Sequence, residues 1–349
     1  MDSVTQFALG AAVGVAAMRH RTVPWKAAVW GGLLGTLPDL DALIPQGNAI
    51  LDMTRHRAES HSLFYLSLLS PLLAGIAARL DGGRRSWPRW WLATWLALVT
   101  HPLLDLMTVY GTRLLLPFSA TPLAVGSIFI IDPLYTLPLL AGLLLSLRDR
   151  GEARWRWNAA GLALSTAYLA WSMLAQAQVT RAAEASLREA ELAYDRLLVT
   201  PAPFNTVLWR LVAVGPDHYH EAYRSLFDKD EKIGWTTHDR CGALIARHFD
   251  HPGIREIADF SRGFHRLESA DGRLFVTDLR MGQEPFYFFR FDVGGAMPDA
   301  RPTRAGWDVP TPAGQRPPIG AGLAWLWQRL KGEPAPPLAA TTPGSHRCD

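Results

Sequence analysis

The sequence predicts an α-helical integral membrane domain of about five to six helices, followed by a smaller soluble domain that is β-rich or α+β. Two observations support this prediction. The 349 residues are 49% hydrophobic and only 19% charged, a composition between those of soluble and membrane proteins. Nearly all of the long apolar runs come before residue 178, whereas the later sequence is mixed and rich in Pro and Gly. The chain is therefore expected to divide near residue 177.

Six apolar segments make up the predicted membrane domain. A spanning helix needs roughly 20 residues, with a range of about 17 to 25. The last four segments fit that length. The first is short and the second carries Pro38, Asp39 and Asp41 near its end, so these two are expected to be half-buried or only partly spanning. The segments are residues 4–18, 27–44, 62–80, 90–107, 129–147 and 158–175.

Basic residues are concentrated in alternate connections between these segments, and by the positive-inside rule those connections face the cytoplasm. The N-terminus, the loops at 45–60 and 109–128 and everything after residue 177 then lie on the opposite, non-cytoplasmic side of the membrane. Arg55, Arg57 and Arg113 oppose this orientation but are fewer. The net charge of the chain is only +3, and its basic residues lie in short clusters between apolar runs. This distribution indicates topology signals, so the expected partner is the lipid bilayer and not nucleic acid. The basic residues of the cytoplasmic connections are Arg19, Arg21, Lys26, Arg79, Arg84, Arg85, Arg89, Arg148, Arg150, Arg154 and Arg156.

The rest of the chain divides into three parts after the membrane domain of residues 1–177. Residues 178–199 are expected to form an amphipathic linker helix, because apolar residues such as Val179, Ala183 and Leu187 recur at helical spacing. A soluble domain follows at 200–330. Its aromatic and β-branched runs at 207–212, 274–279 and 286–291 predict strands. Residues 331–349, which are rich in Pro, are expected to be disordered.

The chain has two cysteines, Cys241 and Cys348, without CxxC or Cys/His finger spacing. A thiol metal site is therefore not expected. A disulfide between the two is left open, since Cys348 lies in the predicted tail.

His101 and Asp105 lie four residues apart inside the fourth apolar segment, so on a helix they share one face. Ionisable groups are costly in a membrane and usually mark function there. Pro102 cannot continue a helical hydrogen bond, and a fresh helix capped by Thr100 is one expected geometry. Either geometry lets both side chains reach a common centre.

Other candidate ligands lie at the ends of the preceding segments. Pro38 is expected to move Leu37 out of the helical region, and in an extended chain Asp39 and Asp41 would share a side. His56 and His61 precede the third segment, where Ser60 is expected to cap the helix and place His61 in its first turn. Ordinary helix-end and loop roles remain the alternatives for these four residues.

With the topology above, all of the candidates fall at the non-cytoplasmic ends of their segments, where independent capping residues would scatter over both faces. A cluster of His and Asp without Cys suits a divalent metal, zinc or manganese, in a mononuclear or binuclear site. Such a site makes hydroxide available to attack an ester or phosphoester, with a carboxylate as base, for which Asp39 and Asp132 are the candidates. The candidate ligands are Asp2, Asp39, Asp41, His56, His61, His101 and Asp105, and Asp2 and Asp132 are either ligands or groups that orient the histidines.

The chain contains several ordered motifs: MDSVTQ at 1–6, LGTLPDLD at 34–41, HR at 56–57, HSL at 61–63, THPLLD at 100–105, YGT at 110–112, LPFS at 116–119 and IIDPLY at 130–135. Together these motifs resemble the YdjM-like, LexA-regulated family of bacterial inner-membrane metal-dependent hydrolases. The resemblance covers about residues 1–145 and implies a membrane-bound hydrolase without naming its substrate. A more distant likeness to zinc-dependent phospholipase C is also expected, but Gln6 stands where that group tends to have a histidine.

The sequence thus leads to the hypothesis of a membrane-bound hydrolase with a metal site at the periplasmic interface, where a lipid or lipid-linked substrate is expected. A metal-binding transporter or sensor without turnover is the alternative. A third hypothesis is a membrane anchor whose function lies in the soluble domain.

Overall fold

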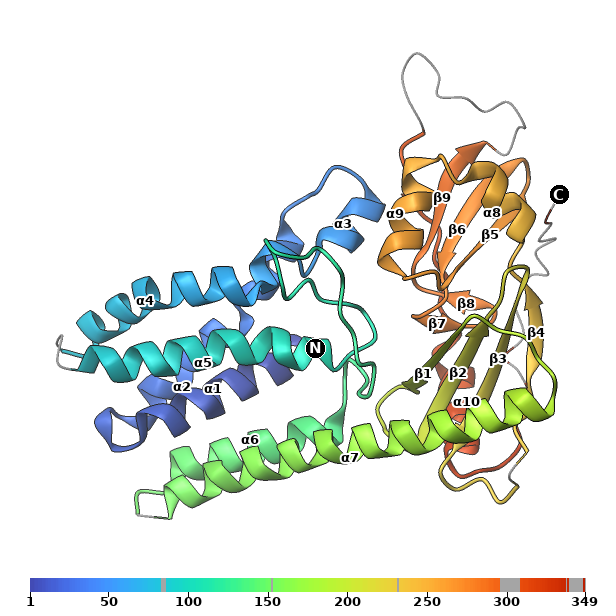
Figure 1. Ribbon diagram of the computed structural model, residues 1–349. Coiled ribbons are helices and arrows are strands. Elements are labelled where there is room, and N and C mark those ends of the chain that lie inside the picture. Colours follow the sequence, from blue (N-terminus) through green and yellow to red (C-terminus); the bar gives the residue numbers. More distant parts are fainter. Residues whose placement is uncertain are drawn as a thin grey trace. The chain divides into compact units, whose positions relative to one another are not determined.

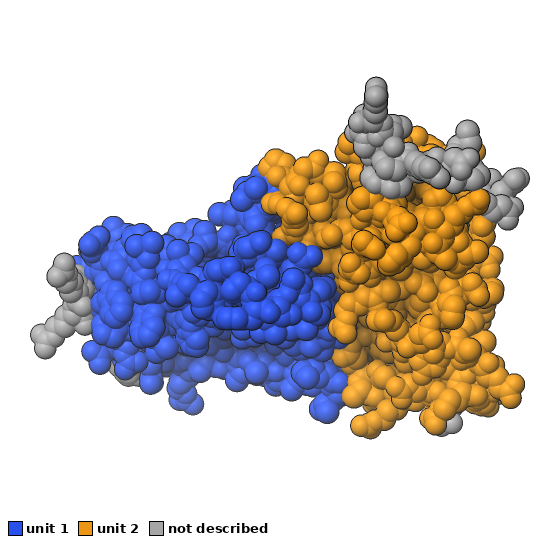
Figure 2. Space-filling model, turned by 45° about the horizontal axis from the view of Figure 1, so that its top comes forward, with its two compact units in different colours: residues 1–44, 56–174, 203–206 blue, residues 45–55, 175–202, 207–349 orange. Residues whose placement is uncertain are grey.

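The computed structural model describes residues 1–82, 86–151, 153–230, 232–295, 308–336, 338 and 348, which form two compact units (Figure 2). Unit 1 consists of Met1–Ile44, His56–Leu174 and Pro203–Thr206. Unit 2 consists of Pro45–Arg55, Ala175–Ala202 and Val207–Asp349. We call Pro45–Arg55 the insert segment, because it interrupts unit 1 in sequence. Arg84, Arg85 and most of the tail at 331–349, for which the sequence predicts disorder, lie outside the described residues.

Unit 1 is built from helices (Figure 1). Two of them begin at aspartates whose side chains accept hydrogen bonds from the first-turn amides: Asp2 accepts from Val4 and Thr5, and Asp132 accepts from Leu134. Short 3₁₀ segments connect the long helices. The elements are α1 (Ser3–Met18), η1 (Arg19–Arg21), α2 (Pro24–Thr36), η2 (Pro38–Leu43), η3 (Glu59–His61), α4 (Leu63–Leu80), α5 (Trp87–Leu106), α6 (Pro133–Arg148) and the first part of α7 (Arg154–Glu189).

Helices α1 and α2 pack against each other through glycines. A Cβ added to Gly10 would lie 2.2 Å from the carbonyl oxygen of Gly31, and one added to Gly35 would lie 2.5 Å from that of Gln6. Small residues permit this approach because no side chain separates the two backbones. The main chain of Gly35 is therefore held against the N-terminal half of α1.

Among the described residues, α4 is the one helix that is both long enough and apolar enough to cross a membrane, with 18 residues. Helices α1, α2 and α6 contain 16, 13 and 16 residues, fewer than the roughly 20 that a span needs. Helix α5 is longer but carries Arg89, His101 and Asp105, which lower its hydropathy. The structure thus gives one candidate span, and the expectation of five to six is not established.

The sixth apolar segment and the start of the predicted linker form one continuous helix, α7, of 36 residues. Val179, Ala183 and Leu187, the stripe that predicts an amphipathic helix, are buried. The first two of these pack in a core cluster of unit 2 with Val199 and Trp209. The following strand already begins at Arg196, inside the range predicted for the linker.

Unit 2 is rich in β-structure, as the sequence predicts. One antiparallel sheet has the order β1 (Arg196–Pro201), β2 (Leu208–Val214), β3 (His218–Ser225), β4 (Thr236–Asp239), and a second has the order β10 (Thr311–Pro312), β9 (Arg290–Gly295), β6 (Arg273–Asp278), β5 (His265–Ala270). A small ribbon pairs β7 (Gly282–Gln283) with β8 (Phe286–Tyr287). The helices of this unit are α3 (Ala49–Arg55), α8 (Gly242–His248), α9 (Pro252–Phe260), α10 (Ile319–Leu330) and the second part of α7.

The runs at 207–212 and 274–279 that predict strands lie largely in β2 and β6. The third, at 286–291, is divided between β8 and the start of β9. Cys241, the residue before α8, is disulfide-bonded to Cys348. The disulfide that the sequence leaves open is therefore formed.

The imidazole of His265 makes the stability of unit 2 depend on pH. Its side chain is buried, and burial together with the charge of Arg240 lowers its pKa from 6.5 to about 4. In the unfolded chain the imidazole takes up a proton near pH 6.5, so folding stability is present at neutral pH and is lost as pH falls from 6.5 towards 4.

The free energy of unfolding of the wild-type protein is expected to fall between pH 7 and pH 5, in part because His265 is protonated in the unfolded chain. In His265→Gln this fall should be smaller by about 2 kcal/mol, which is the contribution that the pKa difference implies. Denaturant unfolding of both proteins at the two pH values, followed by the fluorescence of unit 2, measures this difference. An equal pH dependence in the variant would contradict the assignment. His218→Gln is the control, because that histidine is exposed at the start of β3.

Candidate metal centre

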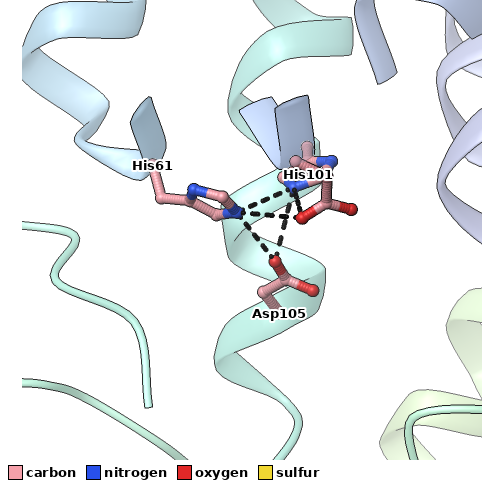
Figure 3. Close-up of side chains that lie close together, drawn as sticks. His61, His101 and Asp105 are labelled. Atoms are coloured by element: carbon pink, nitrogen blue, oxygen red, sulfur yellow. Dashed lines mark hydrogen bonds and ion pairs between the residues drawn. The ribbon is translucent and has the colours of Figure 1, made fainter. Parts of the chain in front are cut away.

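Four side chains from three elements of unit 1 converge. Asp39 lies in η2, His61 ends η3, and His101 and Asp105 lie one turn apart on α5. Each contributes one ligand-type atom, and these four atoms all lie within 4.8 Å of one another. Figure 3 shows His61, His101 and Asp105 pointing toward a common centre. His61, His101 and Asp105 are buried, so the group can hold a metal ion away from bulk water.

Five of the six distances between these atoms are close to those expected around a tetrahedral metal ion, and the two carboxylate oxygens lie within 4.8 Å of each other. The Nε2 atoms of His61 and His101 are 3.0 Å apart. They lie 3.2 and 3.3 Å from Oδ2 of Asp105 and 3.4 and 3.5 Å from Oδ1 of Asp39, in that order. A tetrahedral zinc ion with bonds of about 2.0 to 2.1 Å has ligand atoms roughly 3.3 Å apart. Charged N–H···O hydrogen bonds are shorter, at about 2.7 to 2.9 Å, so protonated histidines fit these distances less well.

Hydrogen bonds fix which nitrogen of each histidine carries the proton. Nδ1 of His101 lies 2.6 Å from the carbonyl oxygen of Gly35, so it donates. Nδ1 of His61 lies 2.9 Å from Oγ of Ser60, and Ser60 itself donates to Oδ2 of Asp41 at 2.5 Å. Since the hydroxyl proton of Ser60 is used in that way, Nδ1 of His61 must also donate. In the neutral imidazoles, both Nε2 atoms are then unprotonated acceptors.

The converging atoms are consequently two imidazole lone pairs and two carboxylate oxygens. Within the described part of the chain, neither Oδ1 of Asp39 nor Oδ2 of Asp105 has a hydrogen-bond donor. Buried acceptors without donors are costly, and four that face one another repel. A cation at their centre removes both penalties, which is the physical argument for a metal here.

The second oxygen of Asp105 is held from the opposite side. Its Oδ1 accepts from Nε2 of Gln6 at 3.0 Å, lies 3.3 Å from Nη2 of Arg57, and contacts the α-amino group of Met1. Gln6 also donates to the carbonyl oxygen of His101 at 3.2 Å. Gln6 therefore supports Asp105 and His101 from behind. Such supporting groups orient metal ligands and tune their basicity.

Asp41 and His56 lie beside the four converging side chains and are hydrogen-bonded to each other. Oδ1 of Asp41 is 2.7 Å from Nδ1 of His56, and its Oδ2 also accepts from the amide of Arg57 at 3.0 Å. Leu37 keeps helical dihedral angles and the chain continues as η2, contrary to the extended geometry expected after Pro38. In a 3₁₀ helix, residues two apart do not share a side. Asp39 therefore faces His61 and His101, whereas Asp41 faces His56.

Three further local expectations differ from the structure. Ser62, not Ser60, caps α4, because its hydroxyl accepts from the amide of Tyr65. Helix α5 runs through Pro102 to Leu106 without restarting. The hydroxyl of Thr100 donates a hydrogen bond to the carbonyl oxygen of Leu96, within the same helix, and Thr100 is not a helix N-cap.

Asp2 and Asp132 are not brought to the group of four. Each is occupied as a helix cap, and Asp132 also accepts a hydrogen bond of 2.9 Å from the hydroxyl of Tyr168. The ligand role expected for Asp2 and the catalytic roles expected for Asp39 and Asp132 stay predictions.

Sequence reasoning missed Arg57 and Ser60. It counts Arg57 among loop charges, whereas the side chain is 2% exposed and contacts Asp105. Arg57 directly follows His56 and Ser60 directly precedes His61. This position next to candidate ligands was the signal that could have identified both residues.

A family model described as "YdjM inner membrane protein" matches residues 1–179, which include every residue of the group and its supporting contacts. The chain belongs to the YdjM family. The family expected from the motifs is therefore confirmed. The curated protein "Uncharacterized protein YfhP" of Bacillus subtilis (strain 168) is 29% identical over 149 residues, which are 41% of this chain and 45% of that protein.

The chain thus spans less than half the length of this relative. No solved structure matches. The likeness to zinc-dependent phospholipase C is not shown by these matches. The family description gives an inner membrane protein and supplies no reaction.

The Ser60 hydroxyl is expected to matter for metal affinity, because it holds the proton of His61 on Nδ1 and so leaves Nε2 free to bind. We expect Ser60→Ala to weaken zinc binding by roughly 10- to 100-fold, the usual effect of removing a partner of a ligating histidine. Titration calorimetry of the purified full-length protein with zinc measures this. Ser119→Ala is the control, since Ser119 contacts Thr121 and no ligand; equal affinities in the two variants would contradict the role.

Proposed function

We propose that this YdjM family protein is a membrane-bound metal-dependent hydrolase that cleaves an ester or phosphoester. One observation supports the proposal above all others: ligand-type atoms of Asp39, His61, His101 and Asp105 converge, and the two carboxylate oxygens among them have no hydrogen-bond donor in the described part of the chain. The Nδ1 contacts of both histidines leave Nε2 as the ligand atom. A divalent cation bound there supplies Lewis acidity, which lowers the pKa of water toward neutrality and polarises the bond to be cleaved.

The residues of the chain have separable roles in this proposal. The two histidines and two carboxylates hold the cation, and Gln6 and Arg57 keep Asp105 turned toward it. Two nitrogen and two oxygen ligands suit zinc, with manganese as the alternative. We propose one cation, because Asp41 and His56, which a second one would need, are hydrogen-bonded to each other. Asp39 is 19% exposed, so substrate and water can approach the group from its side.

The site and unit 2 are proposed to lie on the periplasmic side of the inner membrane. The basic connections of the sequence support this orientation. The disulfide between Cys241 and Cys348 supports it independently, because disulfides form and persist in oxidising compartments such as the bacterial periplasm.

His101→Ala tests the metal and the reaction together. We expect loss of bound zinc, by a larger factor than the roughly 10- to 100-fold that a supporting residue controls, and loss of hydrolysis of 4-nitrophenyl esters and bis(4-nitrophenyl) phosphate. Metal content of the purified full-length protein and initial rates are the measurements. The control is His20→Ala, because His20 contacts Trp155 and no ligand.

Unchanged metal content in His101→Ala would reject the site. If the wild-type protein binds zinc through these residues but hydrolyses neither probe, the proposed hydrolase activity is rejected. The hypothesis of a metal-binding transporter or sensor then remains.

Orientation is tested by single cysteines introduced in a Cys241→Ser, Cys348→Ser background. We expect Gln46→Cys and Leu115→Cys to react with a membrane-impermeant maleimide in intact spheroplasts, and Gly151→Cys to react only after lysis, because positions 46 and 115 lie in loops assigned to the periplasm. The reverse pattern would place the site in the cytoplasm.

A further inference from the structure

An apolar groove lies directly beside the ligand group. It has a volume of about 410 Å³, which is within the range of roughly 300 to 1,000 Å³ seen for small-molecule sites. The apolar lining comes from Tyr65, Leu66 and Leu69 of α4 and from Leu37 and Pro38. Polar side chains enter the lining at one place, where η3 contributes Glu59 and Ser60.

The groove lining contains none of the four candidate ligands, but two of its residues are the sequence neighbours of two ligands. Pro38 directly precedes Asp39, and Ser60 directly precedes His61. Ser60 also touches His61 through the hydrogen bond that fixes its proton. A molecule lying in the groove would thus have a polar group next to the ligands and an apolar portion along α4.

The apolar wall is continuous with the surface that lipid is expected to cover. Helix α4 is the candidate membrane span. Its residues Leu68 and Leu72 are 63% and 66% exposed, and Leu69 of the groove is 36% exposed. Exposed apolar surface of this extent on a spanning helix is ordinary in lipid and unfavourable in water. In a bilayer that surrounds α4, the partly exposed Leu69 would give a hydrocarbon chain an apolar entry to the groove.

We propose that this groove binds one hydrocarbon chain of a membrane lipid and presents the ester or phosphoester of that lipid to the metal group. The groove then selects the substrate class: a lipid that enters from the bilayer. The statement about the reaction rests on the proposed function, whereas the statement about binding stands without it.

Photolabelling tests the binding without any hydrolysis. The full-length protein is placed in nanodiscs of phosphatidylethanolamine and phosphatidylglycerol that contain a small fraction of phosphatidylglycerol with a diazirine in one acyl chain. After illumination, mass spectrometry locates the labelled residues. We expect label to concentrate on Leu37, Leu66 and Leu69 relative to Leu68 and Leu72.

Two adjacent leucines of α4 supply the matched variants. Leu69→Trp fills the groove and is expected to abolish the preferential labelling of Leu37 and Leu66. Leu68→Trp places the same side chain on the outer surface and is expected to preserve it. Label spread evenly over the exposed leucines, unchanged by Leu69→Trp, would overturn the proposal, because that is the pattern of surrounding lipid.

Hydrolysis of 4-nitrophenyl esters and 4-nitrophenyl alkyl phosphates whose alkyl chains range from short to long distinguishes the proposed reaction from the proposed binding of a lipid chain in the groove. We expect Leu69→Trp to slow the long-chain probes by roughly tenfold, an effect typical of a lost apolar subsite, with the shortest probes unaffected. Labelling of the groove without any hydrolysis would overturn the proposed reaction alone. Hydrolysis that ignores chain length, together with even labelling, would overturn the groove alone.

Discussion

The contact between α1 and α2 determines the position of two groups on which the ligands depend. Because glycines meet at this contact, Gly35 packs against the backbone of Gln6. The carbonyl oxygen of Gly35 fixes the proton of His101, and the side chain of Gln6 holds both Asp105 and the backbone of His101. The contact between the two helices thus presents a backbone acceptor of Gly35 and the side-chain donor of Gln6 to α5. The ligand pair on α5 can be held in this way only while the two helices remain at that distance.

The charges around the ligands are arranged asymmetrically. Asp105 is fully buried, and on one side its negative charge faces Arg57 and the α-amino group of Met1, while the neutral amide of Gln6 donates a hydrogen bond to it. The ion-pair contacts of Asp39 among the described residues are with the imidazoles of His61 and His101. Removing a charge from water without a partner is expensive. A cation between the four atoms balances Asp39 and uses the unpaired oxygen of Asp105, so the arrangement selects for positive charge at one point.

Sequence spacing predicts part of this site. His101 and Asp105 are four apart on a regular helix, where periodicity determines which residues share a face. The division of Asp39 from Asp41 could not be predicted, because it depends on whether the chain after Pro38 is extended or 3₁₀. Asp2 and Asp132 could not be distinguished from ligands, since aspartate caps a helix and binds a metal with the same oxygens. The two units are visible in composition, but the insert segment is not, since its partners are distant in sequence.

The insert segment affects the order in which parts of the protein can fold during synthesis. The chain leaves unit 1 after Ile44, contributes α3 to unit 2, and returns at His56. Helix α3 packs against α9 and β10, which are synthesised long after all four ligands. Ile50 of α3 is 1% exposed in the folded protein. Until α9 and β10 have been synthesised, the elements against which α3 packs are missing. Contacts of such sequence separation form slowly, so the loop between Asp39 and His61 reaches its final conformation only when most of the chain has been synthesised.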